Sequence, residues 1–548
     1  MVSILTVPEK KSGTAITVAL TPADTRAWLE KLSHDESGES LTGIYHELHD
    51  LNRIPLKPGL RLRLLEPYRA TVSHIGENIE VGLAAMDIPF PKTQAILAEI
   101  CRRVVIEMAY GYKSVVLDLA RQIRSSRANK DLCTAIHRSI HYLSLTVYRS
   151  TLYYNSQPPG TWVEIHSLFG YARKLGMEQT PVKDALNKSR PKNTISHVYQ
   201  QAILYGMSDA YRLGTPVMCK LYRFLDRWGS LVDTSEFDSA PDTRCQFLVD
   251  PEQDRPAQVL DQRTAPKRTR SMLLVDARAI TNVAHSQWHV LRKGSKPKAN
   301  GLGDGFYDGH GFDMLEQVIR AWGVAPRRKF PRNPISGPFQ LVTGISSSVF
   351  CINGERAFKG ASTRIDAESK APAGTIVEPQ RSVRTEIPDI QIWTGINESI
   401  YGICLAVDLG RASGVLIRIG EVVAYRTDRG NARWSAGLVR WACTTDAELR
   451  MGIQQFGANC RPAVVFPVYV PERPGEGFRP AVFVPADVDA KRQPSLVTPA
   501  GTFRINRKMV IDDGTVTRMA LAGKLLERGP HFDWFEFSLV SQQLDTPG

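Results

Sequence analysis

The sequence lacks any long hydrophobic run. No segment approaches the roughly 20 consecutive apolar residues that a membrane-spanning helix needs. The short apolar start, residues 1–7, runs directly into Glu9, Lys10 and Lys11, and this order of charges does not fit a secretory signal peptide. These absences predict a cytoplasmic protein with no transmembrane segment.

Paired cysteines are also absent. The 8 cysteines are widely spaced and form no C-x-x-C pair, which excludes zinc ribbons and thioredoxin-like redox motifs. Cys404 stands in the apolar run 403–407, so we expect reduced thiols in the core of a cytoplasmic protein. His137 and His141 lie four apart on a predicted helix without a Glu or a third ligand nearby, which favours a helix-surface pair over a metal site.

Familiar signatures of catalysis are missing as well. The chain has no G-x-S-x-G elbow, no paired carboxylates at a recognisable spacing and no Cys/His arrangement. The glycine-rich loop 301–313 lacks both the Lys-Ser/Thr ending of a P-loop and the terminal Glu of an EF-hand, so we interpret it as a flexible connector. We expect no enzymatic activity, no cofactor and no metal.

What the chain does have is length. At 548 residues it exceeds the size that one hydrophobic core usually supports, which predicts several domains. Hydrophobic residues at 43% and charged residues at 23% are typical of folded proteins. The net charge of +13 favours anionic partners, but it is modest for so long a chain and makes nucleic acid an unlikely partner.

The first half of the chain has helical periodicity. Between residues 92 and 228 apolar side chains recur at helical spacing, as in Ile96, Ile100, Val104 and Met108. We therefore predict a mainly helical domain over 1–229, with helix-hairpin repeats as a candidate arrangement. A mixed α/β segment with a basic linker follows over 230–322. Near its end the apolar residues of 314–322 share one helical face, which predicts a helix that leads directly into Arg328.

The second half changes to short apolar runs and period-2 alternation, which predict β-strands. We expect a β-barrel over 323–461, with strands at 339–343, 403–407, 415–419, 422–425 and 438–441. Residues 356–383 have no periodic apolar face and are interpreted as a mobile insertion. Further strand-like runs indicate a β-rich C-terminal extension over 462–548.

A cluster of candidate ligand residues lies at the start of this β region. Arg328 and Arg332 stand four apart around Pro331, and guanidinium groups can pair with phosphates, engage the Hoogsteen edge of guanine and stack on purines. Asn397 and Ser399 offer hydrogen-bonding groups. Gly402 lets a ligand approach the backbone.

These two motifs, R-x-x-x-R followed by N-x-S-x-x-G, resemble those of the PilZ family, and the later runs at 420–423, 434–441 and 449–454 resemble its later strands. The resemblance covers about residues 323–460. It implies an α+β multidomain protein with a PilZ-like six-stranded antiparallel β-barrel. It also implies a bacterial receptor that binds the second messenger cyclic di-GMP through Arg328, Arg332, Asn397, Ser399 and Gly402.

The expected function is signal transduction: binding of cyclic di-GMP changes the interaction with an unidentified protein partner. The motility, pilus and exopolysaccharide machineries are the candidates for this partner. Two alternatives stay open. The barrel could be a degenerate scaffold that acts through the helical domain without nucleotide. The basic segment 263–298, which includes the basic stretch 266–270, could instead bind nucleic acid.

Overall fold

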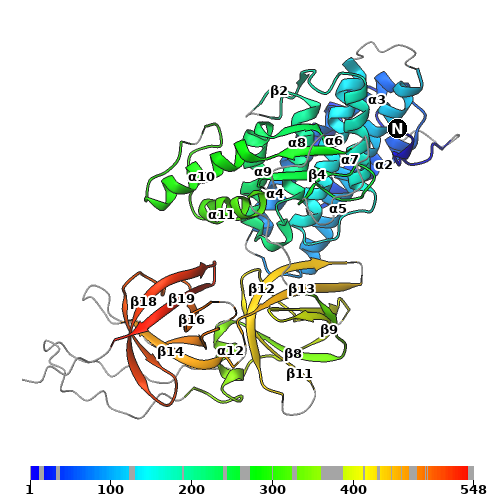
Figure 1. Cartoon of the computed structure of the whole chain (residues 1–548). Helices are drawn as coiled ribbons and strands as arrows, with labels where there is room; N and C mark the ends of the chain where they lie inside the picture. Colours follow the sequence, from blue (N-terminus) through cyan, green and yellow to red (C-terminus); the bar gives the residue numbers. More distant parts are fainter. Residues whose placement is uncertain are drawn as a thin grey trace, which may run out of the picture. The chain divides into compact units, whose positions relative to one another are not determined.

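The computed structural model divides the chain into two compact units, Met1–Met86 with Phe90–Arg327 and Asp87–Pro89 with Arg328–Gly548 (Figure 1). It describes residues 2–11, 18–32, 38–84, 86–122, 130–187, 190–237, 244–259, 272–298, 300–323, 330–358, 387–410, 414–428, 432–445, 447–457, 459–467, 478–487, 489 and 491–540. Within these residues no helix is both long enough and apolar enough to cross a membrane.

Helices dominate the first unit, as predicted for this half of the chain. In chain order they are α1 Pro22–Leu32, α2 Gly38–Arg53, α3 Pro58–Leu65, α4 Tyr68–Leu83, α5 Lys92–Gln122, α6 Lys130–Leu152, α7 Thr161–Lys174, α8 Ile195–Gly206 and α9 Thr215–Trp228. Their starts follow known sequence rules. The Thr194 hydroxyl caps α8 by accepting from the His197 amide at 3.1 Å, and Pro216 occupies the first turn of α9.

The centre of this unit contains buried charges in addition to apolar side chains. Asp184, directly after the short strand Val182–Lys183, accepts from the Arg69 guanidinium at 2.7 Å and from that of Arg138 at 2.9 Å. Although burial opposes ionisation, the two arginines hold the pKa of Asp184 below its usual value. Lys113 and Glu164 form a second buried pair at 2.6 Å. These charges are satisfied by one another inside the fold.

The prediction for the histidine pair was wrong in one respect. His137 is fully buried in the helical core, so it does not lie on the helix surface. Burial, with the neighbouring Arg138, lowers its pKa well below the usual value, and the pKa of His141 falls to about 4 for the same main reason. Among the described residues, no group of three or more His, Cys, Asp or Glu side chains is arranged to hold a metal ion.

The rest of the first unit is mixed α/β. A four-stranded sheet has the order β3-β6-β4-β5, and a short ribbon pairs β1 with β2. The helix expected before the arginine pair is present as α11, with Met314, Leu315, Val318 and Trp322 fully buried on one face. The bounds are β1 Val182–Lys183, β2 Lys192–Asn193, β3 Asp233–Glu236, β4 Gln246–Val249, β5 Gln258–Val259, β6 Leu273–Asp276, α10 Arg278–Arg292 and α11 Gly311–Trp322.

The second unit contains the predicted antiparallel barrel. Its sheet has the order β10-β13-β12-β11-β8-β9-β7, and a further pairing of β10 with β9 closes a ring of six strands. The short strand β7 pairs with β9 beside the end of β8. The strands are β7 Asn333–Pro334, β8 Pro338–Thr343, β9 Gln391–Ser399, β10 Gly402–Asp408, β11 Val422–Thr427, β12 Ser435–Thr444 and β13 Glu448–Gln455, with helix α12, Ile345–Ile352, after β8.

The C-terminal β extension is itself a closed antiparallel barrel, in the order β14-β15-β16-β19-β18-β17. Its strands are β14 Arg461–Pro467, β15 Arg479–Val484, β16 Ser495–Pro499, β17 Lys508–Asp512, β18 Thr517–Arg528 and β19 Phe532–Leu539. Closure pairs β14 with β17. The interior contains small and medium-sized side chains, including Ala463, Val465, Ala481 and Leu496.

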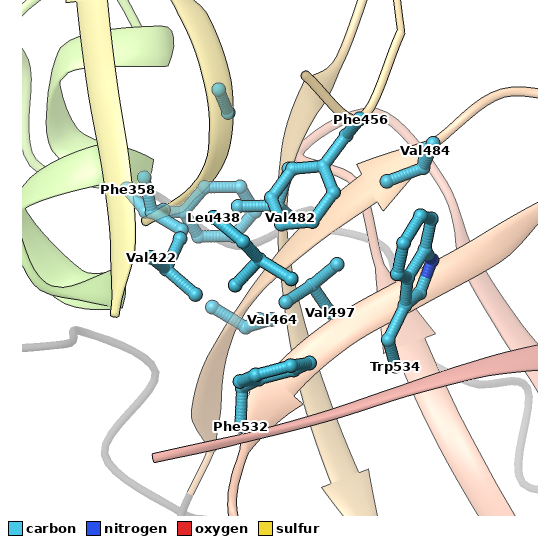
Figure 2. Packing of buried hydrophobic residues seen from close by; sticks show 12 residues of the cluster. Phe358, Val422, Leu438, Phe456, Val464, Val482, Val484, Val497, Phe532 and Trp534 are labelled. Carbon is cyan, nitrogen blue, oxygen red and sulfur yellow. The ribbon is translucent and has the colours of Figure 1, made fainter. Parts of the chain in front are cut away.

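The two barrels share a hydrophobic core (Figure 2). Val422, Leu438 and Phe456 come from the middle barrel. The C-terminal barrel contributes side chains that alternate with those of its own interior, namely Val464, Val482, Val484, Val497, Phe532 and Trp534. Because both faces of these strands are buried, the sequence there reads as continuous apolar runs rather than as alternation.

Some expectations for this half were wrong or fall outside the described residues. Residues 415–419 are not a strand: Ile417 forms only an isolated bridge with Ile88, which belongs to this second unit. Most of the expected insertion 356–383 lies outside the described residues, which omit 359–386. The basic stretch 266–270 also lies outside them. The domain boundaries expected at 230, 323 and 462 stay predictions.

Candidate ligand-binding site

The N-x-S-x-x-G motif forms the hairpin between β9 and β10. Ser399 pairs with Gly402 across a two-residue loop, and Asn397 pairs with Cys404. The Ser399 hydroxyl donates to the Gly402 carbonyl at 3.3 Å, which ties the two ends of the loop together. A Cβ at position 402 would lie 3.3 Å from the Ile453 carbonyl oxygen, so glycine suits the close approach of β13.

Strand register places these residues on the outer face of the middle barrel. On β10, Leu405 is fully buried and pairs with the equally buried Met451 of β13, so both side chains point into the barrel. Side chains alternate along a strand, and directly paired residues share a face. Gly402, Cys404 and their partners Ser399 and Asn397 therefore face outward.

Register also brings Arg332 to this face. The strand β7 pairs Pro334 with Asn397 and Asn333 with Glu398. Extending this antiparallel pairing by one residue puts Arg332 opposite Ser399, on the same face as Asn397. The side chain of Arg332 is exposed. An accessible guanidinium thus lies beside the amide, hydroxyl and glycine of the hairpin.

The electrostatics of Cys404 support this placement. Burial raises the pKa of the Cys404 thiol, while the nearby positive charges of Arg332 and Arg450 lower it in part. Two guanidinium groups therefore act on the same point of the outer face, one from each side of the β9–β10 hairpin. Such a pair of fixed positive charges suits a ligand that carries two negative charges.

The structure thus brings together four of the five predicted site residues: Arg332, Asn397, Ser399 and Gly402. Arg328 lies outside the described residues, so its position relative to the hairpin stays a prediction. Phe330, between the two arginines, meets the ring of Tyr401 edge-on, with 5.4 Å between the ring centroids. Through Phe330, the arginine segment, residues 328–332, therefore contacts the tip of the hairpin.

Sequence reasoning missed two residues of the same face. Arg450 pairs with Ala406 across β13 and β10, and its side chain is 47% exposed. Trp441 pairs with Gly452, where a Cβ would stand only 1.9 Å from the indole nitrogen, so the indole lies across the glycine. Strand alternation could have placed Arg450 on an outer face, but only the pairing of β13 with β10 shows which residues it adjoins.

Three family models match the chain in order. The models are described as cyclic-di-GMP receptor FimW, N-terminal domain, over residues 23–240; cyclic-di-GMP receptor FimW, middle PilZ domain, over 246–390; and FimW C-terminal beta-barrel domain, over 467–540. The PilZ match includes the arginine segment and ends before Asn397.

A similar curated protein is the cyclic-di-GMP receptor FimW of Pseudomonas aeruginosa. It is 24% identical to this chain over 574 residues, covering 96% of the chain and 92% of that protein. The likeness extends through the helical part and both barrels, and is not confined to the motifs.

Proposed function

Because this chain belongs to the PilZ-domain cyclic di-GMP receptor family, we propose that it binds cyclic di-GMP on the outer face of the middle barrel and acts by binding rather than by catalysis. The main support for this site is the register of β7 on β9, because its extension by one residue brings Arg332 beside Ser399 and Asn397. Binding would order the arginine segment over the ligand and so change a surface that a partner recognises.

Each predicted residue has a distinct role in this proposal. The guanidinium groups of Arg328 and Arg332 pair with phosphate or with a guanine edge. The Asn397 amide and the Ser399 hydroxyl donate to the ligand from the hairpin. Gly402 keeps the backbone accessible. Arg450 and Trp441 extend the face with a second charge and a flat aromatic surface on which a purine can stack.

We also propose that the protein is cytoplasmic and acts on a protein partner. A cytoplasmic protein fits the 8 free cysteines, since disulfides are rare in reducing compartments. The partner is a protein that recognises the ligand-bound form, and the motility, pilus or exopolysaccharide machinery is the expected context.

Calorimetric titration of the full chain tests this function, with cyclic di-GMP as ligand and with GTP and the linear diguanylate as controls. We expect Arg332→Ala to weaken binding by about 2 kcal/mol, roughly thirtyfold, because a charge-assisted hydrogen bond is lost. Arg504→Ala, an exposed arginine of the C-terminal barrel, is the matched control and should leave affinity unchanged. Absence of binding heat with the wild-type protein would contradict the proposal and favour the ligand-independent scaffold.

A further inference from the structure

Arg440 occupies an irregular position on the middle barrel. Val439 pairs with Ile453 and Trp441 with Gly452, so Arg440 is an extra residue that has no partner in the β12–β13 register. Such a bulge turns the side chain away from the regular alternation of the strand. This change in direction allows Arg440 to reach both the neighbouring strand and the second barrel.

The guanidinium of Arg440 connects the two barrels. Its Nε donates to the side-chain oxygen of Gln454 at 2.7 Å. Its Nη2 donates to Oε2 of Glu527 on β18 at 2.6 Å, and Nη1 donates to the other oxygen of the same carboxylate. The two side chains are only 16% and 26% exposed, so water screens this bidentate pair less than it screens a surface pair.

Gln454 carries the connection to the candidate ligand face. It pairs directly with Gly402, the glycine of the hairpin motif. The next residue, Gln455, donates its backbone amide to the Tyr401 carbonyl at 3.1 Å. A continuous series of contacts therefore runs from Glu527 of the C-terminal barrel, through Arg440 and Gln454, to the hairpin that holds Asn397, Ser399 and Gly402.

A second contact runs from the tip of the hairpin to the C-terminal barrel. The Tyr401 hydroxyl donates to Oδ1 of Asp487, in the segment after β15, at 3.5 Å. The same ring meets Phe330 of the arginine segment. Tyr401 thus touches the candidate arginine segment on one side and the second barrel on the other.

From these contacts we propose that Glu527 is a positioning residue for the ligand site, through which the C-terminal barrel holds the β9–β10 hairpin in its binding geometry. The inference rests on the proposed function for its ligand and adds a residue from the other barrel. Because binding free energies are reciprocal, a ligand that prefers the ordered hairpin also strengthens the docking of the two barrels.

Two measurements on the full chain test this role. In the absence of ligand, hydrogen exchange should rise in peptides covering residues 397–408 and 448–456 when Glu527→Gln weakens the ion pair. In titrations with cyclic di-GMP, the same variant should raise Kd by about three- to tenfold. Glu527→Asp keeps the negative charge, so its hydrogen exchange and its Kd should both lie closer to the wild-type values than those of Glu527→Gln.

Arg518→Gln provides the matched control. Arg518 lies on the same strand as Glu527, but its ion-pair partner Asp513, at 3.8 Å, belongs to the same C-terminal barrel. Its loss should therefore leave both readouts at wild-type values.

The outcomes separate this inference from the function it rests on. If the wild-type protein does not bind cyclic di-GMP, the proposed function fails, and hydrogen exchange alone decides whether Glu527 positions the hairpin. If Glu527→Gln leaves exchange unchanged, or raises exchange without changing Kd in a protein that binds, the positioning role is overturned.

Discussion

The helical unit and the middle barrel use arginine in opposite ways. In the helical unit, Arg69 and Arg138 are almost fully buried and share the carboxylate of Asp184. On the outer face of the barrel, Arg332 is exposed and Arg450 is about half exposed. A buried arginine is held by its protein partner, whereas an exposed arginine can still reach a ligand, even when it is paired as Arg450 is with Glu448. The comparison shows that burial, not the number of arginines, separates structural from ligand-binding candidates.

The largest test of this contrast is Arg138→Ala. Removing Arg138 leaves the buried Asp184 carboxylate with Arg69 as its remaining arginine partner, so we expect the free energy of unfolding of the helical unit to fall by about 3 kcal/mol. Urea unfolding followed by the helical circular dichroism signal measures this loss. Arg332→Ala should change the same quantity by less than about 0.5 kcal/mol. An Arg138→Ala protein with normal stability and weakened ligand binding would reverse the assignment.

Glu421 gives an intermediate test, because it is a partly buried acid in the barrel unit whose pKa is raised. Burial raises its pKa to about 7, against a partial opposing effect of Arg418. The folded protein therefore keeps this proton between pH ~4.5 and ~7 while the unfolded chain loses it, so stability falls as pH rises through that window.

Replacing Glu421 by glutamine should remove this dependence. We expect Glu421→Gln to gain on the order of 1–3 kcal/mol at pH 8 and almost nothing at pH 4. Urea unfolding at the two pH values provides the measurement. An equal gain at both pH values would show that packing, and not ionisation, is responsible.

The smallest effect is expected for Arg450→Ala. Its ion pair with Glu448 is partly exposed, and such pairs contribute little to stability, so the free energy of unfolding should stay within about 0.5 kcal/mol of wild type. Affinity for cyclic di-GMP should fall by about 1 kcal/mol, roughly fivefold, through the loss of one positive charge at the face. Unchanged affinity in titration calorimetry would remove Arg450 from the site.

The sequence predicted features that depend on local pattern. Helical spacing located the helical half and α11, and the apolar run 403–407 located β10. Features that depend on long-range pairing were beyond it. The closure of the second barrel needs β14 to meet β17, and the position of Arg450 needs β13 to meet β10. The surface position predicted for His137 was wrong because a polar residue on a helix usually faces water, whereas the packing of this unit buries His137 completely.

The shared core between the barrels limits how the protein can be divided. A fragment that ends before β14 would leave Val422, Leu438 and Phe456 facing water, although all three are almost completely buried in the full chain. Contiguous apolar surface of this kind promotes self-association. Fragments that contain the middle barrel without the C-terminal barrel would therefore precipitate. A binding experiment on such a fragment would not separate a loss of affinity from a loss of solubility.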